Sequence, residues 1–466
     1  MSGSTSAVET GAISDQKSSS PPPSQSREIL RLAIPAMLAI ASEPILSLAD
    51  TAMIGHLGVE PLAARAIASA LIGGIYWVFT FLIFGTTTLV GYHYGANEPE
   101  ACGEICLQAI LFAIVGGIAI AFFSILFAPH LYSLMGAEQT VLASGSSYFR
   151  IRMAGTPFTF LFYATVGFLR GTQNTRTPMF IALFVNGLNI VLDYVLIYGA
   201  FGLPAMGLRG AAIASLVSQA IAGAICIRLL FFSSYTPQYG LTRWRFDPRR
   251  LLPLSRIGRD IAIRTGALRF SMIFATAMIS RMGAGVLASH EIAFQLWLLC
   301  SDTIDGLAVA GQALVAKYLG SNRKEQAIRL GKTLVLWGCA AGLLFALGYI
   351  LFQQPLIALF TKSPEVIQTL SSGWMFLLLA LFLPFNGIVF VLDGVLIGAH
   401  DTRFLMWAML IGALGIFIPI AWISLQWDLG LLAVWVGLTL LMAYRLATNL
   451  FRFLSKRWIS AFPVRS

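Results

Sequence analysis

The most constraining feature of this 466-residue chain is a succession of long apolar segments separated by short connections. About twelve of them reach roughly twenty residues, enough to cross a hydrocarbon core of about 30 Å as a helix. Bilayer-spanning strands instead alternate polar and apolar residues in stretches of about ten, a pattern that is missing here. We therefore expect an all-α polytopic membrane protein with about twelve transmembrane helices in two six-helix bundles. The expected spans are 30–55, 66–92, 103–128, 143–169, 177–199, 208–232, 257–281, 288–318, 325–352, 370–397, 404–425 and 429–453.

The composition excludes several other classes of protein. Only 11% of the residues are charged and 57% are hydrophobic, whereas a soluble domain carries roughly 25% charged residues. A water-soluble enzyme, a disordered protein and a coiled coil are therefore excluded. The five cysteines form no CxxC pair, and neither a GKS/T phosphate loop nor a HExxH motif is present. We expect no cofactor, no metal site and no ATP drive.

The basic residues predict the orientation in the membrane. If the N-terminus is cytoplasmic, the inside segments hold about 20 Lys and Arg and the outside loops about four, as the positive-inside rule requires. The four outside residues are Arg65, Arg209, Arg281 and Lys362. We expect both termini in the cytoplasm, and we interpret the net charge of +10 as an orientation signal, with no nucleic-acid partner. A bacterial-type plasma membrane is favoured, and an organelle membrane is the alternative.

Polar stretches divide the chain into expected domains. Residues 1–26 are rich in Ser and Pro and predict a disordered cytoplasmic tail. The segment 234–256 is a basic cytoplasmic linker between an N-lobe at 27–233 and a C-lobe at 257–455. Residues 456–466 form a second cytoplasmic tail.

The two lobes are related by an internal repeat. The segment ADTAMIGHLGVEPLAARAIA (49–68) aligns without gaps with FATAMISRMGAGVLASHEIA (274–293), and nine of the twenty positions are identical. Farther along, RGTQNTR (170–176) matches IGAHDTR (397–403). An even number of helices per repeat gives both halves the same orientation, with a symmetry axis along the membrane normal and a central cleft at the seam.

Acidic residues inside the predicted spans are the first candidates for function. A charged side chain at the bilayer centre costs on the order of 2.5–3.5 kcal/mol on insertion scales. Asp50 aligns with Ala275 in the second repeat, and Asp193 aligns with Ile420. The scaffold therefore packs without acids at these positions, which favours a functional role for both aspartates.

Helical spacing gathers further polar residues around these aspartates. Glu43 lies two turns before Asp50, and Asn186 and Asn189 precede Asp193 on one helix face. If the two faces meet, they form a buried pocket of carboxylates and amides. Neighbouring buried carboxylates with few other oxygen ligands favour a proton as the coupling ion, and Na⁺ is the alternative.

The second lobe holds secondary candidates. Its predicted spans contain Asp302, Asp305, Asp393, Glu291 and Arg269. Glu291 stands near an outer loop, where a solvated helix start is an equally good interpretation. Arg269 either pairs with an acid or lines the cleft, and Arg264 is expected to be an interfacial anchor.

The motifs as a group resemble one transporter family. The run ADTAMIGHLG in the first helix, NIVLDYVLIYG in the fifth, the RGxxxTR pattern after the fourth and its echo in the second half are similar to the multidrug and toxic compound extrusion (MATE) family, in its DinF-like branch. The resemblance implies a V-shaped pair of lobes that exports organic cations or amphiphiles against an inward flow of protons or sodium ions. It assigns cation coupling to Asp50, Asn189 and Asp193, and it makes Asp393 and Glu291 second-choice sites because related branches place acids in that lobe.

Other functions remain as alternatives. A lipid-linked precursor flippase of the same superfamily would typically have fourteen helices and a basic cavity. A membrane-embedded enzyme would need a nucleophile or metal constellation, and the sequence shows none. The expected partners are small organic substrates and the lipid bilayer, and a monomer is expected.

Overall fold

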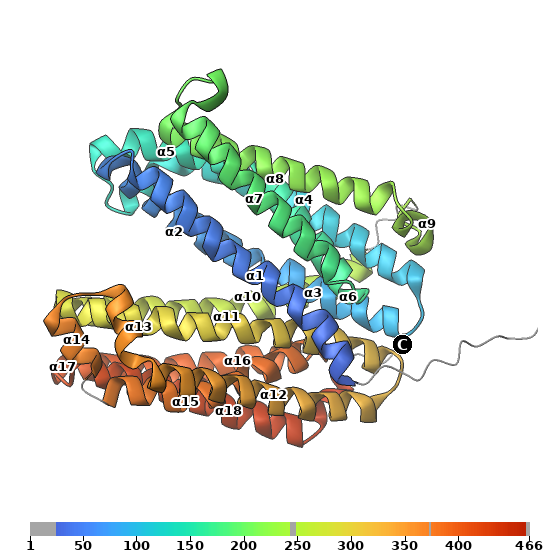
Figure 1. The fold of residues 1–466 in the computed structure, drawn as a ribbon. Coiled ribbons are helices and arrows are strands. Elements are labelled where there is room, and N and C mark those ends of the chain that lie inside the picture. Colours follow the sequence, from blue (N-terminus) through green and yellow to red (C-terminus); the bar gives the residue numbers. More distant parts are fainter. Residues whose placement is uncertain (1–24, 243–247, 372–373, 463–466) are drawn as a thin grey trace, which may run out of the picture.

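The computed structural model describes residues 25–242, 248–371 and 374–462. Within these ranges the regular structure is entirely helical. Figure 1 shows two bundles that converge at one end and separate toward the other, so that the molecule has the shape of a V. The expected all-α fold with two lobes is confirmed.

The N-terminal bundle is built from the first half of the chain. Its first, third, fifth and sixth membrane helices are single elements, and its second and fourth are each divided in two. The elements are α1 (Gln25–Gly55), α2 (Val59–Phe79), α3 (Phe81–Gly95), α4 (Pro99–Leu134), α5 (Gln139–Ala154), α6 (Thr156–Gly171), α7 (Arg176–Tyr198), η1 (Ala200–Gly202), α8 (Gly207–Phe231) and the short α9 (Tyr235–Tyr239).

The C-terminal bundle repeats this arrangement with two extra short helices between its third and fourth spans. Its elements are α10 (Pro248–Ile279), η2 (Ser280–Met282), α11 (Ala284–Gly320), α12 (Lys324–Leu351), α13 (Gln353–Phe360), α14 (Pro364–Ser371), α15 (Trp374–Gly398), α16 (Thr402–Gly412), the π-helical turn η3 (Ala413–Phe417), α17 (Ile418–Gln426), α18 (Gly430–Leu454) and η4 (Arg457–Ser460).

Eleven helical stretches in the described ranges are long and apolar enough to cross a membrane. The twelfth expected span, 143–169, is divided at Gly155 into α5 and α6. Large apolar side chains are exposed on the outside of the bundles, among them Phe122, Phe123 and Leu344. Such a surface is stable against lipid chains, because no hydrophobic penalty arises where water is absent.

Some predicted boundaries differ from the structure. The segment 234–256, expected to be a linker, contains α9 and the first residues of α10. The tail predicted at 1–26 lies almost wholly outside the described residues. The second tail, 456–466, is packed as far as it is described, because Trp458 is buried and Phe462 stacks on Tyr92 with 3.9 Å between ring centroids.

The lobes meet where α3 and α11 end, and a pair of glycines allows this contact. A Cβ atom on Gly95 would lie 1.9 Å from the carbonyl oxygen of Lys317, and one on Gly320 would lie 1.8 Å from the carbonyl oxygen of Tyr92. The repeat register pairs Gly95 with Gly320 and Tyr92 with Lys317. The two contacts are therefore equivalent under the pseudo-twofold axis.

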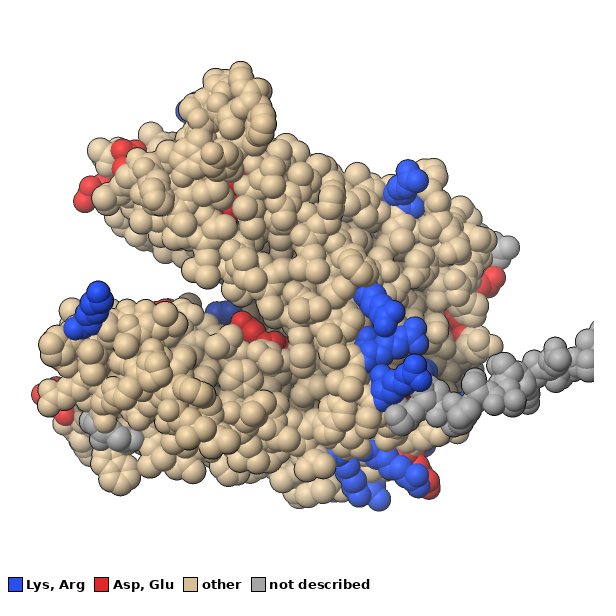
Figure 2. All heavy atoms as spheres, viewed as in Figure 1, with Lys and Arg blue, Asp and Glu red and all other residues tan. Residues whose placement is uncertain are grey.

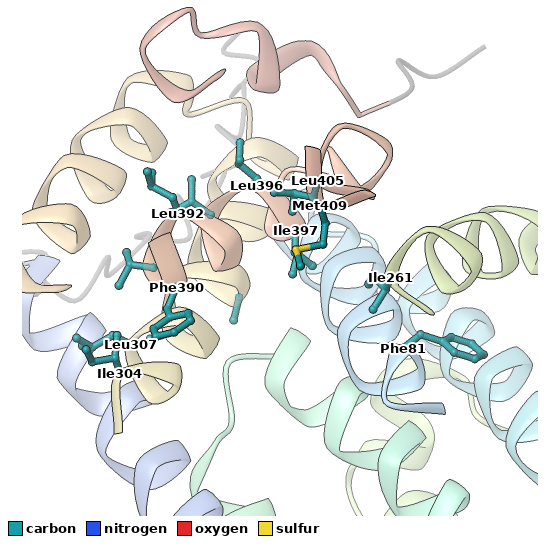
Figure 3. Packing of buried hydrophobic residues seen from close by; sticks show 14 of the residues in the cluster. Phe81, Ile261, Ile304, Leu307, Phe390, Leu392, Leu396, Ile397, Leu405 and Met409 are labelled. Carbon is teal, nitrogen blue, oxygen red and sulfur yellow. The ribbon is translucent and has the colours of Figure 1, made fainter. Parts of the chain in front are cut away.

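A continuous apolar core surrounds this junction and joins both bundles. In Figure 3, Phe81 of α3 lies beside Ile261 of α10, and Ile304 and Leu307 of α11 lie beside Phe390 of α15. Gln312 of α11 adds a polar link across the lobes, since its amide donates to the carbonyl oxygen of Phe84 at 2.7 Å. The converging end of the V is thus a closely packed junction between the lobes.

Substituting the glycines tests this packing. We expect Gly95→Ala and Gly320→Ala each to destabilise the protein by about 1–3 kcal/mol, because an added methyl group must push two backbones apart. The control is Gly73→Ala in α2, where a Cβ meets nothing within 4 Å and where Ala is preferred to Gly by roughly 0.5–1 kcal/mol. Thermal unfolding of the purified variants in detergent measures the effect. Equal midpoints for Gly95→Ala and Gly73→Ala would contradict the close contact.

Candidate functional site: a carboxylate pair in the N-lobe

The centre of the candidate site is formed by α1 and α7, which pack side by side in the N-lobe. Asp193 of α7 is fully buried, and Asp50 of α1 is 8% exposed. Their carboxyl groups are within hydrogen-bonding distance of each other. Asn189 donates from Nδ2 to Asp193 Oδ2 at 3.2 Å. The structure therefore brings together the three residues to which the family resemblance assigns cation coupling.

Each aspartate in this pair has one oxygen without a hydrogen-bond donor. Among the described residues, Asp50 Oδ1 and Asp193 Oδ1 are buried and accept no hydrogen bond. An ionised carboxylate has no donor of its own, so two ionised partners leave both oxygens unsatisfied. A proton on either carboxyl group would supply a donor to the other.

Two arginines that the sequence interpretation did not assign to the site approach this pair. Arg65 of α2 is buried, and its Nη2 lies 3.8 Å from Asp50 Oδ2 and donates to the carbonyl oxygen of Ser47 at 3.0 Å. Arg152 of α5 is close enough to interact with the charges of both aspartates. Placing Arg65 in an outside loop was wrong, because α2 begins at Val59. The internal repeat could have indicated that Arg65 is not a loop residue. Arg65 aligns with His290, which also lies within a helix and is buried.

Glu43 and Asn186 lie outside the carboxylate pair. Asn186 donates from Nδ2 to Ser42 Oγ at 2.9 Å. Glu43 is exposed, and its strongest charged neighbours are Asp302 of the C-lobe and Arg152. Glu43 shares a helix with Asp50 but its side chain borders the open space between the lobes.

The opening between the lobes carries charged side chains at its base, as Figure 2 shows. Asp302 and Asp305 of α11 are near each other, and Asp305 also interacts electrostatically with Arg170 of α6. Arg269 of α10 places its guanidinium 3.6 Å from the centroid of the Trp77 ring, across the lobe boundary. Two of the secondary candidates thus form an acidic part of the cleft, and Arg269 lines it.

Asp393 is held in a different manner. It is buried in α15 and accepts from Arg264 of α10 and Arg445 of α18, each at 2.5 Å to Oδ2, and from Asn449 Nδ2 at 2.9 Å to Oδ1. Arg264, whose side chain is 14% exposed, is therefore an ion-pair partner of Asp393, and its assignment as an interfacial anchor was wrong. Arg445 was missed, since it lies far from α15 in sequence. With two guanidinium groups on one carboxylate, every oxygen of Asp393 is satisfied.

Glu291 belongs to neither cluster. It is exposed near the start of α11 and accepts from Gln295 Nε2 at 2.7 Å, one turn along the same helix. The adjacent His290 is buried between the rings of Phe294 and Trp435. The structure places Glu291 outside the cluster around Asp393.

The fold is that of a two-lobed, multi-pass membrane protein with buried polar clusters, and comparisons with known proteins identify its family as one of transporters. The family model described as MatE matches the chain twice, at residues 35–195 and 262–423. The chain belongs to the MatE family of transporters. The double match also reproduces the internal repeat.

Relatives and solved structures extend this comparison. The chain is 28% identical over 443 residues to "Probable multidrug resistance protein NorM" of Thermotoga maritima, covering 93% of each chain. It is also 28% identical to "DNA damage-inducible protein F" of Escherichia coli, covering 91% of this chain and 90% of the relative. A crystal structure described as MATE in the bent conformation superimposes with a TM-score of 0.85 at 23% identity, covering 94% of this chain and 96% of the other.

The Asp393 cluster leads to a prediction of stability. We expect Asp393→Asn to lower the stability by about 3–5 kcal/mol, because it removes the carboxylate that pairs with the buried Arg445 and with the largely buried Arg264. Glu291→Gln is the control: the residue is exposed, and a surface change of this kind is usually within about 0.5 kcal/mol. Both are measured by thermal unfolding in detergent. Wild-type stability of Asp393→Asn would show that the cluster does not hold the C-lobe together.

Proposed function

We propose that this transporter is a secondary active exporter of toxic or drug-like organic compounds, driven by antiport of a cation and working by alternating access of its two lobes. A proton is the favoured coupling ion. The observation that carries the proposal is the pair formed by Asp50 and Asp193, two buried carboxyl groups in contact with each other and each with one oxygen that lacks a donor.

The contrast with Asp393 supports placing coupling in the N-lobe. Asp393 is saturated by two arginines and an asparagine, so neither of its oxygens lacks a donor. The Asp50–Asp193 pair gains a hydrogen bond when one member takes up a proton. A group that gains a partner on protonation and returns to an open pair on release is suited to carry protons.

The surroundings of the pair favour a proton over Na⁺. A hard cation needs several oxygen ligands free of other cations. Arg65 already stands 3.8 Å from Asp50, and the side-chain oxygen of Asn189 faces Ser215 Oγ at 3.5 Å. A proton needs only two facing carboxyl oxygens, and it avoids placing a second cation beside the guanidinium group.

Helix α1 is the element that can connect protonation to movement of the lobes. It packs against α7 in its own lobe and against α11 of the other lobe. Pro35 and Pro44 lie inside it, and each removes a backbone hydrogen bond and weakens the helix against bending. A change of charge at Asp50 alters the contact with α7, and α1 transmits the change to α11.

The driving force is sufficient. A proton entering along 100 mV supplies about 2.3 kcal/mol, and one pH unit adds about 1.4 kcal/mol. Export of a monovalent cation against the same voltage uses about 2.3 kcal/mol. The remaining 1.4 kcal/mol or so corresponds to a roughly tenfold substrate gradient.

The cleft indicates the class of substrate. Glu43, Asp302 and Asp305 border it from both lobes, and the ring of Trp77 offers an aromatic face that already holds a guanidinium group. Acidic and aromatic groups together bind organic cations and amphiphiles. The relatives described as multidrug resistance proteins are consistent with this class.

The charge distribution supports an orientation. Lys and Arg gather at the end where the lobes converge (Figure 2), and such residues mark the cytoplasmic side. We place both termini in the cytoplasm and the opening of the V on the outer side, in a bacterial-type plasma membrane. We further propose that one chain suffices for transport, since both lobes of the cleft come from it.

Substitution of the aspartates tests the coupling site. We expect Asp50→Asn and Asp193→Asn each to abolish resistance in drug-hypersensitive cells at equal expression, because an amide cannot take up or release the proton. Asp428→Asn, in the exposed turn before α18, is the control and should export like the parent. Full export by both site variants would refute the assignment.

The identity of the ion is tested separately. In proteoliposomes, we expect an imposed pH gradient to drive export without Na⁺, and substrate addition to the purified protein to release protons. Both signals should disappear in Asp50→Asn and persist in Asp428→Asn. Export that requires a Na⁺ gradient and ignores the pH gradient would identify sodium as the coupling ion.

A further inference from the structure

A polar cavity lies at the closed end of the V, apart from the carboxylate pair and the open cleft. We call it the basal pocket. Among its lining residues are Arg31 of α1, Tyr94 of α3, Thr175 and Arg176 at the start of α7, and Lys317 of α11. Its volume of about 480 Å³ greatly exceeds the approximately 30 Å³ that one water molecule takes up in the liquid. It can therefore hold a polyatomic group.

The basal pocket has more positive charge than its own residues neutralise. Among the described residues, Glu28 is the one acidic residue in its lining. Its Oε1 pairs with Lys317 Nζ at 3.7 Å, and its Oε2 accepts a hydrogen bond from the Tyr318 hydroxyl at 2.5 Å. Within the described part of the chain, Arg31 and Arg176 form no ion pair. Both arginines are exposed, so two solvent-accessible guanidinium groups from different helices line one open pocket without a counter-charge from the protein.

A buried donor without a partner points to the same cavity. Thr175 is 3% exposed, and its Oγ1 has no hydrogen-bond partner among the described residues. The hydroxyl is not used as the cap of α7, because the backbone N–H of Thr177 is bound by Asn174 Oδ1 at 3.1 Å. Thr175 therefore has a hydroxyl without a partner and belongs to the lining of the pocket, at a helix end whose dipole favours negative charge.

We propose that the basal pocket binds an anionic phosphate group. Paired guanidinium forks match the oxygens of a phosphate, and a helix N-terminus and a buried hydroxyl add neutral donors. The group is either the headgroup of an anionic phospholipid or free inorganic phosphate, since basic pockets between membrane helices on the cytoplasmic side bind lipid phosphates.

Binding in the basal pocket depends on the conformation of the lobes. Arg31 and Arg176 belong to the N-lobe, whereas Lys317 belongs to the C-lobe and lies in the glycine contact with α3. This inference rests on the alternating access proposed above, in which the lobes separate at this end and Lys317 moves away from the two arginines. A bound phosphate therefore stabilises the conformation in which this end is closed, by its difference in affinity for the two states.

The test compares variants with two charges changed. Arg31→Gln/Arg176→Gln removes the unpaired cations, and Arg31→Lys/Arg176→Lys keeps charge without the guanidinium fork. The matched control is Arg329→Gln/Lys332→Gln, which removes two exposed cations from α12 outside the pocket. Thermal unfolding is followed with inorganic phosphate against chloride at equal ionic strength, and in phosphatidylcholine nanodiscs with or without phosphatidylglycerol.

We expect phosphate, phosphatidylglycerol or both to raise the unfolding midpoint of the parent and the control, with a weaker rise for the lysine variant and none for the glutamine variant. At a phosphate concentration ten times Kd, the folded state gains about elevenfold over the unfolded state. A rise with lipid alone identifies a headgroup, and a rise with phosphate alone identifies a soluble anion. Equal rises in all four proteins, or none in the parent, would overturn the proposal. Midpoints without added anion report whether the variants fold.

Discussion

The structure of this transporter depends on the cost of a charge in a medium without water. A carboxylate buried in the bilayer must be neutralised by partners or by a proton. In the C-lobe, Arg264, Arg445 and Asn449 saturate Asp393, which is the first solution. In the N-lobe, Asp50 and Asp193 interact with each other and leave two oxygens without a hydrogen-bond donor. The first arrangement is a structural link, and the second is where we propose that a proton binds.

The packing of the lobes differs between the closed end and the open end of the V. At the closed end, Gly95 and Gly320 let α3 and α11 approach until backbone meets backbone, and an apolar core surrounds the contact. Toward the open end, charged residues from both lobes border the cleft. Helix α1 connects the two regions because it touches both lobes. The proposed proton site at Asp50 thus lies on a helix that contacts both lobes.

The sequence predicted those site residues that stand out within one helix, and it did not predict residues that enter the site from helices far away along the chain. Asp50 and Asp193 were selected as candidate site residues because a charged residue in an apolar helix is recognisable from the sequence alone. The second repeat has Ala275 and Ile420 at the equivalent positions. Arg445 is equally charged and was overlooked. Its partner Asp393 lies 52 positions away, and no periodicity joins two helices. Glu43 was predicted to join the site and does not. A spacing of two helical turns does not fix the direction of a side chain in a helix with internal prolines.

The sequence by itself determined the all-helical fold, the repeat and the family, because hydrophobicity and helical period act locally along the chain. Only the tertiary structure decided which charges neutralise each other. It showed that Arg65 is buried against Asp50 and is not in a loop, that Arg264 binds Asp393, and that Arg31, Arg176 and Lys317 line one cavity. Electrostatic pairing depends on distance in space, and helices that are remote in sequence set that distance only when they pack.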